Sequence, residues 1–403
     1  MANLLLNNPS SSLQNNNNNN GKQHDNNYYV LSLGMLVLDY VVVVDNFPKQ
    51  DTKQTALKQQ LGGGGNAANT AVQLSRLGIK SRLISKVGND LNGKILMDEL
   101  KSEQVNIDGV EVEKITIDEE NNTKKKTVTS FVMVANDTRT IISMPYEQRI
   151  SDVSEQFLFN HLSLFHDVSL LHCDGRHLDA AYFAVKIAIE KKINILVEAE
   201  LRSKALMKIH GEGLRRLLNH ATYIVTNKHY PLELHGNNTN NSNNTNNNNN
   251  NNNNNKWKED TYYCNNNNNN NLNKMEISLL RMLDHYPKCK YLIITLGEEG
   301  CIAVKKIKEN VYDMYHVDAY NLDTNINPIV DTTGAGDAFI GGFIEGIVHS
   351  YPIEMTLKRA SFIGAMNCLK GYGARYNMQN KNMMDQAIGK IDTITCKKRT
   401  IVL

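Results

Sequence analysis

The chain has 403 residues, and 44 Lys and Arg against 42 Asp and Glu give a formal net charge of +2 at pH 7. Such a balanced charge argues against a strongly basic surface that binds nucleic acid, so no nucleic-acid partner is expected. No run approaches the ~18 apolar residues of a membrane-spanning helix, so no membrane partner is expected. The six cysteines show neither zinc nor disulfide spacing and the N-terminus lacks a secretory signal, which predicts a cytoplasmic location.

Two Asn-rich segments interrupt the chain. Residues 1–27 form a polar tail with an Asn run, and residues 237–273 are mostly Asn. Polar tracts of this kind bury too little apolar surface to offset the entropy lost on ordering, so both segments are predicted to be disordered. The folded domain is therefore predicted to span residues 28–380, with 237–273 as a loop insertion and 381–403 as a C-terminal tail.

Strand-like and helix-like patterns alternate along this domain. In chain order, the predicted elements are strands at 30–38 and 41–44, a helix at 66–77, a strand at 81–87, a helix capped by Asp90, a hairpin of 128–134 and 138–144, a helix at 178–191, strands at 193–197, 221–225, 291–295 and 300–304, and helices at 338–348 and 355–369. Strands that alternate with helices predict an α/β fold whose mostly parallel sheet is covered on both faces. The early hairpin strands predict a smaller β element beside it.

The run Asp-Thr-Thr-Gly-Ala-Gly-Asp at residues 331–337 carries the strongest chemical signal. Its two glycines permit a tight turn that exposes backbone N–H groups, and a helix begins directly afterwards. The N-terminus of a helix attracts anions, and Asp337 would place a proton acceptor beside that anion site. Taken alone, such a run is more often a loop with a carboxylate cap.

A second glycine run, at residues 62–65, precedes Asn66 and Asn69. It matches neither a phosphate-binding P-loop nor a dinucleotide fingerprint, because the residues that follow are different. Amide side chains beside an accessible backbone match the hydroxyl groups of a carbohydrate, whereas the alternative is a flexible loop with an Asn cap.

Two aspartates upstream are also candidates for binding the hydroxyl groups of a carbohydrate. Asp39 ends the predicted strand 30–38, where ligands of open α/β sheets bind, and Asp51 follows a few residues later. A carboxylate at either position would accept hydrogen bonds from vicinal hydroxyls. For Asp51, a surface turn is an equally good interpretation.

Together these runs resemble the signatures of the PfkB, or ribokinase-like, carbohydrate kinases. Residues 62–69 with 87–90 resemble the N-terminal signature of that family, and residues 331–339 resemble its C-terminal signature. Thr-Leu-Gly at 295–297 and Gly-Tyr-Gly-Ala at 371–374 resemble its nucleotide-contacting segments. Within the family, the chain is most similar to ketohexokinase and plant PfkB members. The resemblance implies a three-layer ribokinase-like fold with a small β lid.

The resemblance also implies roles for individual residues. Asp337 would be the catalytic base, beside an anion hole formed by the backbone amides of Gly334, Ala335 and Gly336. The implied sugar-binding residues are Asp39, Asp51, Gly65, Asn66 and Asn69. The implied nucleotide-binding residues are Thr295, Gly297 and Gly373, and the implied ligands of a monovalent cation such as K⁺ are Asp331 and Thr333. ATP and Mg²⁺ are implied as cofactors, but Tyr230 stands where many members have the Glu of an Asn-x-x-Glu motif.

The expected function is ATP-dependent phosphorylation of a hydroxymethyl group on a ketose or pentose. One alternative is a nucleoside-type kinase of the same fold, for example for pseudouridine. A second is a non-catalytic sugar-binding or scaffold protein whose Asn tracts mediate association. The expected partner is a small-molecule sugar, and the chain is expected to be a monomer or a homodimer paired through the lid.

Overall fold

The computed structural model describes most of the predicted domain. The described residues are 28–115, 117–118, 123–135, 138–200, 204–231, 272–323, 328–369 and 371–403. The predicted tail 1–27 and residues 237–271 of the predicted insertion lie outside these ranges. Asn273, predicted as the last residue of the insertion, instead caps a helix, because its side chain accepts from the Glu276 amide at 3.0 Å.

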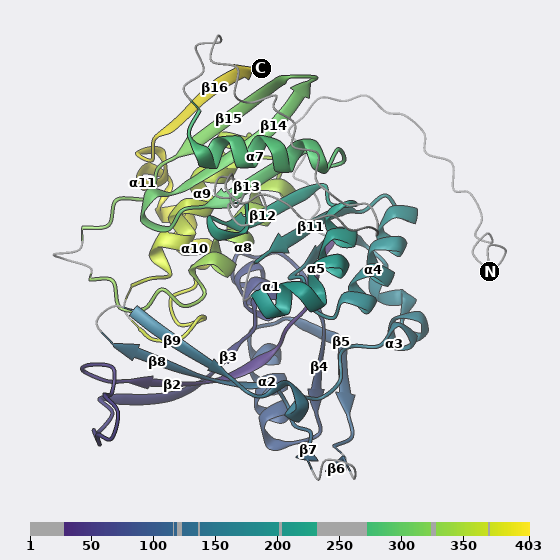
Figure 1. Ribbon diagram of the computed structural model, residues 1–403, viewed down its shortest axis with the longest axis vertical. Coiled ribbons are helices and arrows are strands. Elements are labelled where there is room, and N and C mark those ends of the chain that lie inside the picture. The colour runs from purple at the N-terminus through teal and green to yellow at the C-terminus, as the bar shows by residue number, and fades with distance from the viewer. Residues whose placement is uncertain are drawn as a thin grey trace, which may run out of the picture.

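A ten-stranded sheet forms the middle layer of the described residues (Figure 1). In spatial order its strands are β16 (Cys396–Val402), β15 (Val311–Val317), β14 (Cys301–Lys308), β13 (Tyr291–Thr295), β12 (Tyr223–Asn227), β11 (Asn194–Ala199), β10 (Val168–Cys173), β1 (Tyr29–Leu33), β4 (Ser81–Gly88) and β5 (Asn106–Glu113). Neighbours from β13 to β5 pair in parallel, and the pairs from β13 to β16 are antiparallel. The central parallel strands, from β13 to β4, are mostly buried, as parallel sheets require, whereas the edge strand β5 is partly exposed.

Helices cover both faces of this sheet. One apolar cluster joins it to α3 (Glu155–Asn160), α4 (Leu178–Glu190), α5 (Lys204–Leu218) and α7 (Lys274–His285). On the other face, a second cluster joins it to α1 (Asn66–Arg76), α8 (Ala335–Val348), α9 (Ile353–Met366), α10 (Lys381–Gln386) and α11 (Ile388–Asp392). A third cluster seats α2 (Leu91–Ser102) against β4 and β5. In the described part of the chain, no helix combines the length and apolar character needed to cross a bilayer.

A separate four-stranded sheet, the lid, lies beside this body (Figure 1). Its strands, in spatial order, are β3 (Lys58–Gly64), β2 (Val37–Val43), β8 (Thr129–Ala135) and β9 (Thr138–Ser143). The pair β8–β9 is the predicted hairpin. A short ribbon of β6 (Ile117–Asp118) and β7 (Thr123–Lys124) lies outside both sheets. The predicted α/β fold, with a mostly parallel sheet between helices and a small β lid, is confirmed.

The prediction of one buried strand over residues 30–38 was wrong. β1 ends at Leu33, the chain crosses to the lid, and Asp39 lies inside β2 rather than at the end of a central strand. The crossing depends on Gly34, because a Cβ there would lie 2.0 Å from the Asp174 carboxylate. The apolar pattern continues through the crossing, since Leu36 and Leu38 are buried as completely as β1, and so it conceals the break.

The glycine run at 62–65 is mostly strand, not loop. Gly62, Gly63 and Gly64 belong to β3, and Gly64 pairs with Val37 of β2. The missing side chains make room for charged neighbours: a Cβ on Gly63 would lie 1.9 Å from the Arg375 guanidinium, and one on Gly64 would lie 2.1 Å from the Asp39 carboxylate. The run therefore brings backbone close to two ionised groups.

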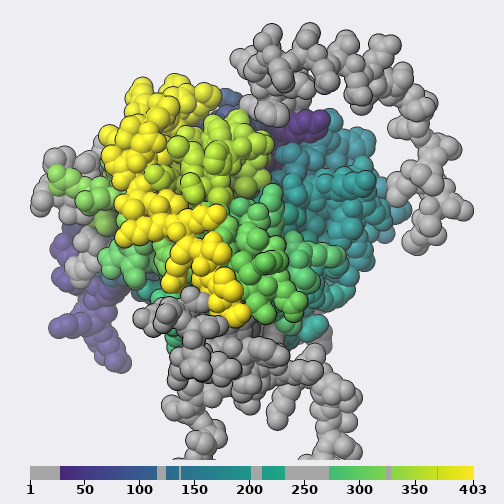
Figure 2. Space-filling view, turned by 90° about the horizontal axis from the view of Figure 1, so that it is seen from above, coloured from purple at the N-terminus to yellow at the C-terminus, as the bar shows by residue number. Residues whose placement is uncertain are grey.

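Residues 381–403 are part of the folded body rather than a tail. They form α10, α11 and β16, and β16 pairs along its length with β15. This segment packs on the surface of the body beside the C-terminal half of the chain (yellow in Figure 2). The Lys-Lys-Arg run in β16 hides its strand character, since these charges are tolerated on an edge strand where one side faces solvent.

Candidate active site

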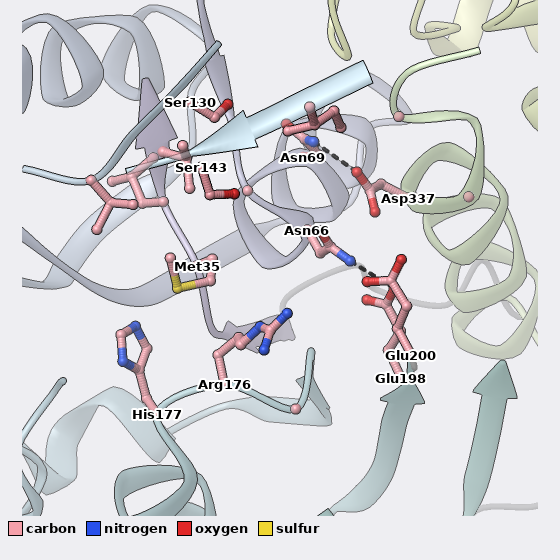
Figure 3. Close-up of a pocket in the computed structure, with 18 of the residues that line it drawn as sticks. Met35, Asn66, Asn69, Ser130, Ser143, Arg176, His177, Glu198, Glu200 and Asp337 are labelled. Atoms are coloured by element: carbon pink, nitrogen blue, oxygen red, sulfur yellow. Dashed lines mark hydrogen bonds between the residues drawn. The ribbon is translucent and has the colours of Figure 1, made fainter. Parts of the chain in front are cut away.

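A cavity of about 710 Å³ lies between the lid and the central sheet (Figure 3). Its walls come from β2, β8 and β9, the start of α1, the loop before α4, the ends of β11 to β13, and the start of α8. The predicted site residues that line it are Asp39, Gly65, Asn66, Asn69, Thr295, Thr333, Gly334, Gly336 and Asp337. Those that do not line it are Asp51, Gly297, Asp331, Ala335 and Gly373.

Asp337 lies in the first turn of α8 and is only 8% exposed. The Asn69 amide from α1 donates to its Oδ2 at 2.7 Å (Figure 3). The Asn69 Oδ1 in turn accepts from the Arg375 Nε at 2.9 Å, which fixes which end of the amide faces Asp337. The carboxylate is therefore held in one orientation beside the cavity.

Arg375 supports this pair from behind. Its guanidinium also donates to the Gly64 carbonyl at 3.1 Å and to Glu99 at 3.0 Å, and the residue is 5% exposed. Arg375 was not predicted as a site residue, because its partners lie about three hundred positions away along the chain and no local pattern indicates such a contact.

The loop that precedes α8 has the geometry of an anion site. Gly334 occupies the cap position with a left-handed φ of 77°, and Gly336 has open space where a Cβ would be. The N-terminus of a helix carries unpaired amides and the positive end of the helix dipole, both of which attract anions. The Ala335 amide, however, donates to the Thr332 carbonyl at 3.3 Å, so in this structure it stabilises the turn and is not directed at a ligand in the cavity.

Asp331 organises this loop instead of lining the cavity. Its Oδ1 accepts from the Thr333 amide at 2.9 Å and hydroxyl at 2.6 Å, and its Oδ2 accepts from the Gly373 amide at 2.8 Å. It therefore ties the late glycine segment to the start of α8. Among the described residues, no cluster of three or more His, Cys, Asp or Glu side chains has a metal-binding arrangement.

Asp39 approaches the cavity from the lid. Its carboxylate accepts a hydrogen bond from the Ser130 hydroxyl on the neighbouring strand β8. Burial raises the pKa of Asp39 to about 6, although the Ser130 hydrogen bond and the Arg375 charge oppose the shift. Burial thus disfavours the ionised form that would accept hydrogen bonds from a ligand.

This raised pKa makes stability depend on pH. Because the folded pKa exceeds the unfolded value, protonated Asp39 contributes stability that is fully present below about pH 4 and lost as the pH rises through 6. Relative to Asp39→Asn, wild type is expected to lose about 2–3 kcal/mol of unfolding free energy between about pH 4 and pH 7.5. Urea unfolding of both proteins at the two pH values measures this difference, and parallel pH dependences would contradict it.

Glu198 positions the second predicted sugar-binding amide. The Asn66 Nδ2 donates to Glu198 Oε1 at 2.8 Å, and Glu198 and Glu200, around the end of β11, both line the cavity (Figure 3). Tyr230, at the position of the motif Glu, is fully buried in the apolar core, so its hydroxyl does not reach the cavity. The cavity carboxylates on this side therefore come from β11 and its following loop.

The lid also contacts the opposite wall. Arg139 of β9 donates to the Thr332 hydroxyl, and Gln60 of β3 donates to the Tyr372 carbonyl. The Lys58 ammonium lies over the Tyr372 ring at 5.4 Å. These contacts join the lid to the two glycine-containing loops, so the lid covers the cavity in this structure.

Asp51 is not at the site. It lies in the exposed turn between β2 and β3, with a left-handed φ of 60°, and this turn projects from the body (Figure 1). The expectation that Asp51 and Asp39 of the same chain lie together at the sugar site is therefore not met. The two aspartates are separated because β2 continues past Asp39 before the chain turns.

Asp174 connects three segments beside the cavity through hydrogen bonds. It was not predicted as a site residue. Its Oδ2 accepts from the Met35 amide at 2.8 Å and the Ala67 amide at 3.2 Å, and its Oδ1 accepts from the Arg176 amide at 3.0 Å. It thus joins the crossing before β2, the start of α1 and the loop before α4.

Comparison with known sequences agrees with this geometry. The pfkB family carbohydrate kinase profile matches residues 27–380. A Pyrococcus horikoshii protein named as a sugar kinase is 28% identical over 348 residues, covering 85% of this chain and 90% of that protein. The Arabidopsis thaliana protein named "Probable fructokinase-3" is 24% identical over 359 residues, covering 85% and 86%. Mus musculus ketohexokinase is 26% identical over 193 residues, covering 46% and 61%.

Solved structures share the fold. An E. coli protein described as a Ribokinase II, solved with ATP and Mg²⁺, has a TM-score of 0.65 at 19% identity and covers 90% of this chain and 99% of its own. Arabidopsis thaliana ribokinase, solved with ribose and ATP, has a TM-score of 0.61 at 17% identity, covering 89% and 98%. Burkholderia thailandensis nucleoside kinase, solved with inosine, has a TM-score of 0.61 at 18% identity, covering 91% and 98%. The predicted ribokinase-like fold is confirmed.

Proposed function

Because this chain belongs to the PfkB family of carbohydrate kinases, we propose that it transfers the γ-phosphoryl group of ATP to a hydroxymethyl group of a ketose or pentose. One observation carries the proposal. Asp337, oriented by Asn69, directly follows the glycine loop in the first turn of α8, and both line the cavity that Asp39 and Asn66 also line. A proton acceptor, an anion site and hydroxyl-binding groups therefore share one enclosed space.

Asp337 would accept the proton of the acceptor hydroxyl as its oxygen bonds to phosphorus. An alcohol is a poor nucleophile at neutral pH, and a carboxylate is a weak base toward it. Asp337 therefore acts through its fixed position, which the Asn69 amide supplies at 2.7 Å. As the bond between the γ-phosphorus and the oxygen that bridges the β- and γ-phosphates breaks, ADP leaves with its electron pair.

The start of α8 would stabilise the charge on the transferring group. The Gly334 and Gly336 amides and the dipole of α8 would attract its negative charge, and the space beside Gly336 is open where a Cβ would lie. On the nucleotide side, Thr295 lines the cavity at the end of β13, and Gly297 follows with a φ of 67° and no neighbour within 4 Å of its Cβ position. Gly373 is held nearby by Asp331.

Divalent metal would be bound mainly by the phosphates, with oxygen ligands from the cavity wall. Hard cations such as Mg²⁺ prefer carboxylate and amide oxygens, and Glu198, Glu200 and Asn227 all line the cavity. Bound Mg²⁺ neutralises phosphate charge during transfer. A monovalent cation such as K⁺ at Asp331 and Thr333 would have to share the Asp331 carboxylate with its present hydrogen-bond donors.

An acceptor screen tests this proposal. Purified protein with ATP and Mg²⁺ is offered ketoses, aldoses and nucleosides, and ADP release is measured for each. Turnover with a free sugar supports the assignment, whereas no turnover with any acceptor would reject it.

One observation favours the nucleoside alternative. Tyr146, which is 60% exposed, lines the cavity together with Ile141 of the lid, and an aromatic ring beside an apolar side chain can stack on a base. A free sugar has no base that could pack against these two side chains. Preferential turnover of nucleosides in the same screen would establish this alternative.

The Asn-rich insertion is expected to be dispensable for phosphotransfer. Residues 237–273 fall between β12 and α7, and among the residues that the structure describes, those that line the cavity belong to other segments. Replacing residues 237–271 with a short Gly-Ser linker keeps the Asn273 cap of α7 and is expected to leave kcat and both KM values within about twofold, because loop length affects closure entropy only logarithmically. Steady-state kinetics checks this, and loss of turnover would show that the insertion has a function.

Assembly and location complete the proposal. The outer face of the lid exposes an apolar row of Leu61, Phe131 and Ile142, each about half exposed, which favours the lid-paired homodimer over the monomer. Sedimentation velocity distinguishes the two states.

Cytoplasmic action is consistent with the described cysteines, which are all free thiols, as expected in a reducing compartment.

A further inference from the structure

His177 has a backbone conformation that non-glycine residues rarely adopt. Its φ of 47° and ψ of 51° are left-handed, and it precedes α4 without a capping hydrogen bond from its side chain. The other left-handed non-glycine residues of the described chain are all exposed: Asp51, Gln104, Asp167, Lys192, Asn310 and Ser350. His177 is 8% exposed. A strained conformation retained in a buried position is typical of a ligand-binding site.

The imidazole faces the cavity. His177 lines it together with Met35 and Arg176, and its ring points toward Met35 (Figure 3). Asp337 lies across the cavity from it in the same view. His177 is therefore placed at the acceptor side, away from the group proposed to start the chemistry.

A carboxylate orients the ring. His177 Nδ1 lies 3.0 Å from Asp152 Oδ1, and the Val153 backbone N–H can donate to the same nitrogen at 3.4 Å only when Nδ1 carries no proton. The shorter contact, to a charged acceptor, favours a proton on Nδ1. In the neutral ring Nε2 then carries the lone pair, and it is available to accept a hydrogen bond from a hydroxyl.

Neighbouring contacts hold both members of this pair in place. The Lys86 ammonium donates to the Ser151 hydroxyl at 2.8 Å and lies 2.7 Å from Glu113, which anchors the segment that carries Asp152. Asp174 fixes the Arg176 amide on the other side. A polar group supported from two sides is preorganised for recognition, since little entropy is lost when a ligand binds.

We propose that His177 recognises, through Nε2, an acceptor hydroxyl remote from the hydroxymethyl group that receives the phosphate. The inference rests on the proposed kinase activity and deepens it by naming a specificity residue. His177 would contribute to acceptor binding and take no part in making or breaking the P–O bonds. It would favour acceptors that present a hydroxyl donor at this end over those that present hydrogen.

The test compares His177→Asn and His177→Gln with wild type. Asn tolerates the left-handed backbone but is too short to replace Nε2, whereas Gln places an amide close to the Nε2 position. His177→Asn is expected to raise the acceptor KM about tenfold while kcat and the KM for ATP stay within about twofold. His177→Gln is expected to recover part of the loss. Lys192→Asn, at the exposed left-handed residue after the same helix, is the matched control.

Deoxy analogues of the best acceptor sharpen the test. Each deoxy analogue lacks one hydroxyl remote from the phosphorylated carbon. For one of these analogues, the wild-type kcat/KM should be lower than for the parent sugar. His177→Asn should show similar kcat/KM values for that analogue and the parent sugar. Asp152→Asn, which leaves the ring but loosens it, should raise the acceptor KM about threefold. An active His177→Asn variant with unchanged acceptor KM, or one with kcat and both KM values impaired alike, overturns this inference alone. Lack of phosphotransfer by wild type overturns the proposed function itself.

Discussion

Replacing Asp337 with Asn is expected to lower kcat by about 10²–10⁴-fold, the usual cost of removing a general base. The variant keeps the size of the side chain, and its amide oxygen still accepts from Asn69, so the fold should be retained. What is lost is the ability to take the proton of the acceptor hydroxyl. Both KM values should change little, because the nucleotide and sugar contacts come from other residues.

The measurement is steady-state kinetics on the best acceptor found in the screen. Asp98→Asn is the matched control, because it makes the same chemical change at an exposed position in α2. Thermal unfolding of both variants establishes that any loss of turnover is chemical. Near-normal kcat for Asp337→Asn would reject its assignment as the base.

Replacing each of two glycines of the anion loop with Ala is expected to change the free energy of unfolding in opposite directions. Gly334 has a φ of 77°, and a Cβ there would lie 2.7 Å from the carbonyl oxygen of Ala374. Gly334→Ala should therefore cost about 2–4 kcal/mol of unfolding free energy, from left-handed strain and overpacking together. Because the loop must move to relieve the clash, kcat/KM should fall by at least about tenfold.

Gly336 is the matched comparison within the same loop. Nothing lies within 4 Å of its Cβ position, and it is already inside α8, so Gly336→Ala should raise stability by up to about 1 kcal/mol. The new methyl group would nevertheless occupy the space proposed for the transferring phosphoryl group, so activity should fall. Urea unfolding and kinetics of the two variants measure both effects. An active, stabilised Gly336→Ala variant would contradict the proposed anion site.

Local patterns predicted the elements that are defined by nearby residues. The helix α1 begins at Asn66 and ends before Gly78, which takes a positive φ of 82°, and the Asp90 side chain accepts from Gly93 as a cap should. Each of these features depends on residues within a few positions of one another. They could therefore be predicted from sequence, whereas β16 could not, because its strand character comes from pairing with β15.

The site was predicted in its parts but not in its connections. Glycines and amides indicated where Asn69 and Gly334 would act, and the family resemblance implied that they share a site with Asp337. The supporting contacts of Arg375 and Asp174 join segments far apart in sequence, and their residue types give no signal by themselves. Asp51 failed for the converse reason: its sequence context fits a ligand, but the length of β2 carries it away from the cavity.

The Asn69–Asp337–Arg375 network has a consequence for the biosynthesis of the enzyme. Asn69 leaves the ribosome early, whereas Arg375 and the edge strand β16 are among the last residues translated. A stalled or truncated product that ends before residue 375 contains the amide and the base but not the guanidinium that orients the amide. Such products therefore lack the contact that fixes the Asn69 amide against Asp337.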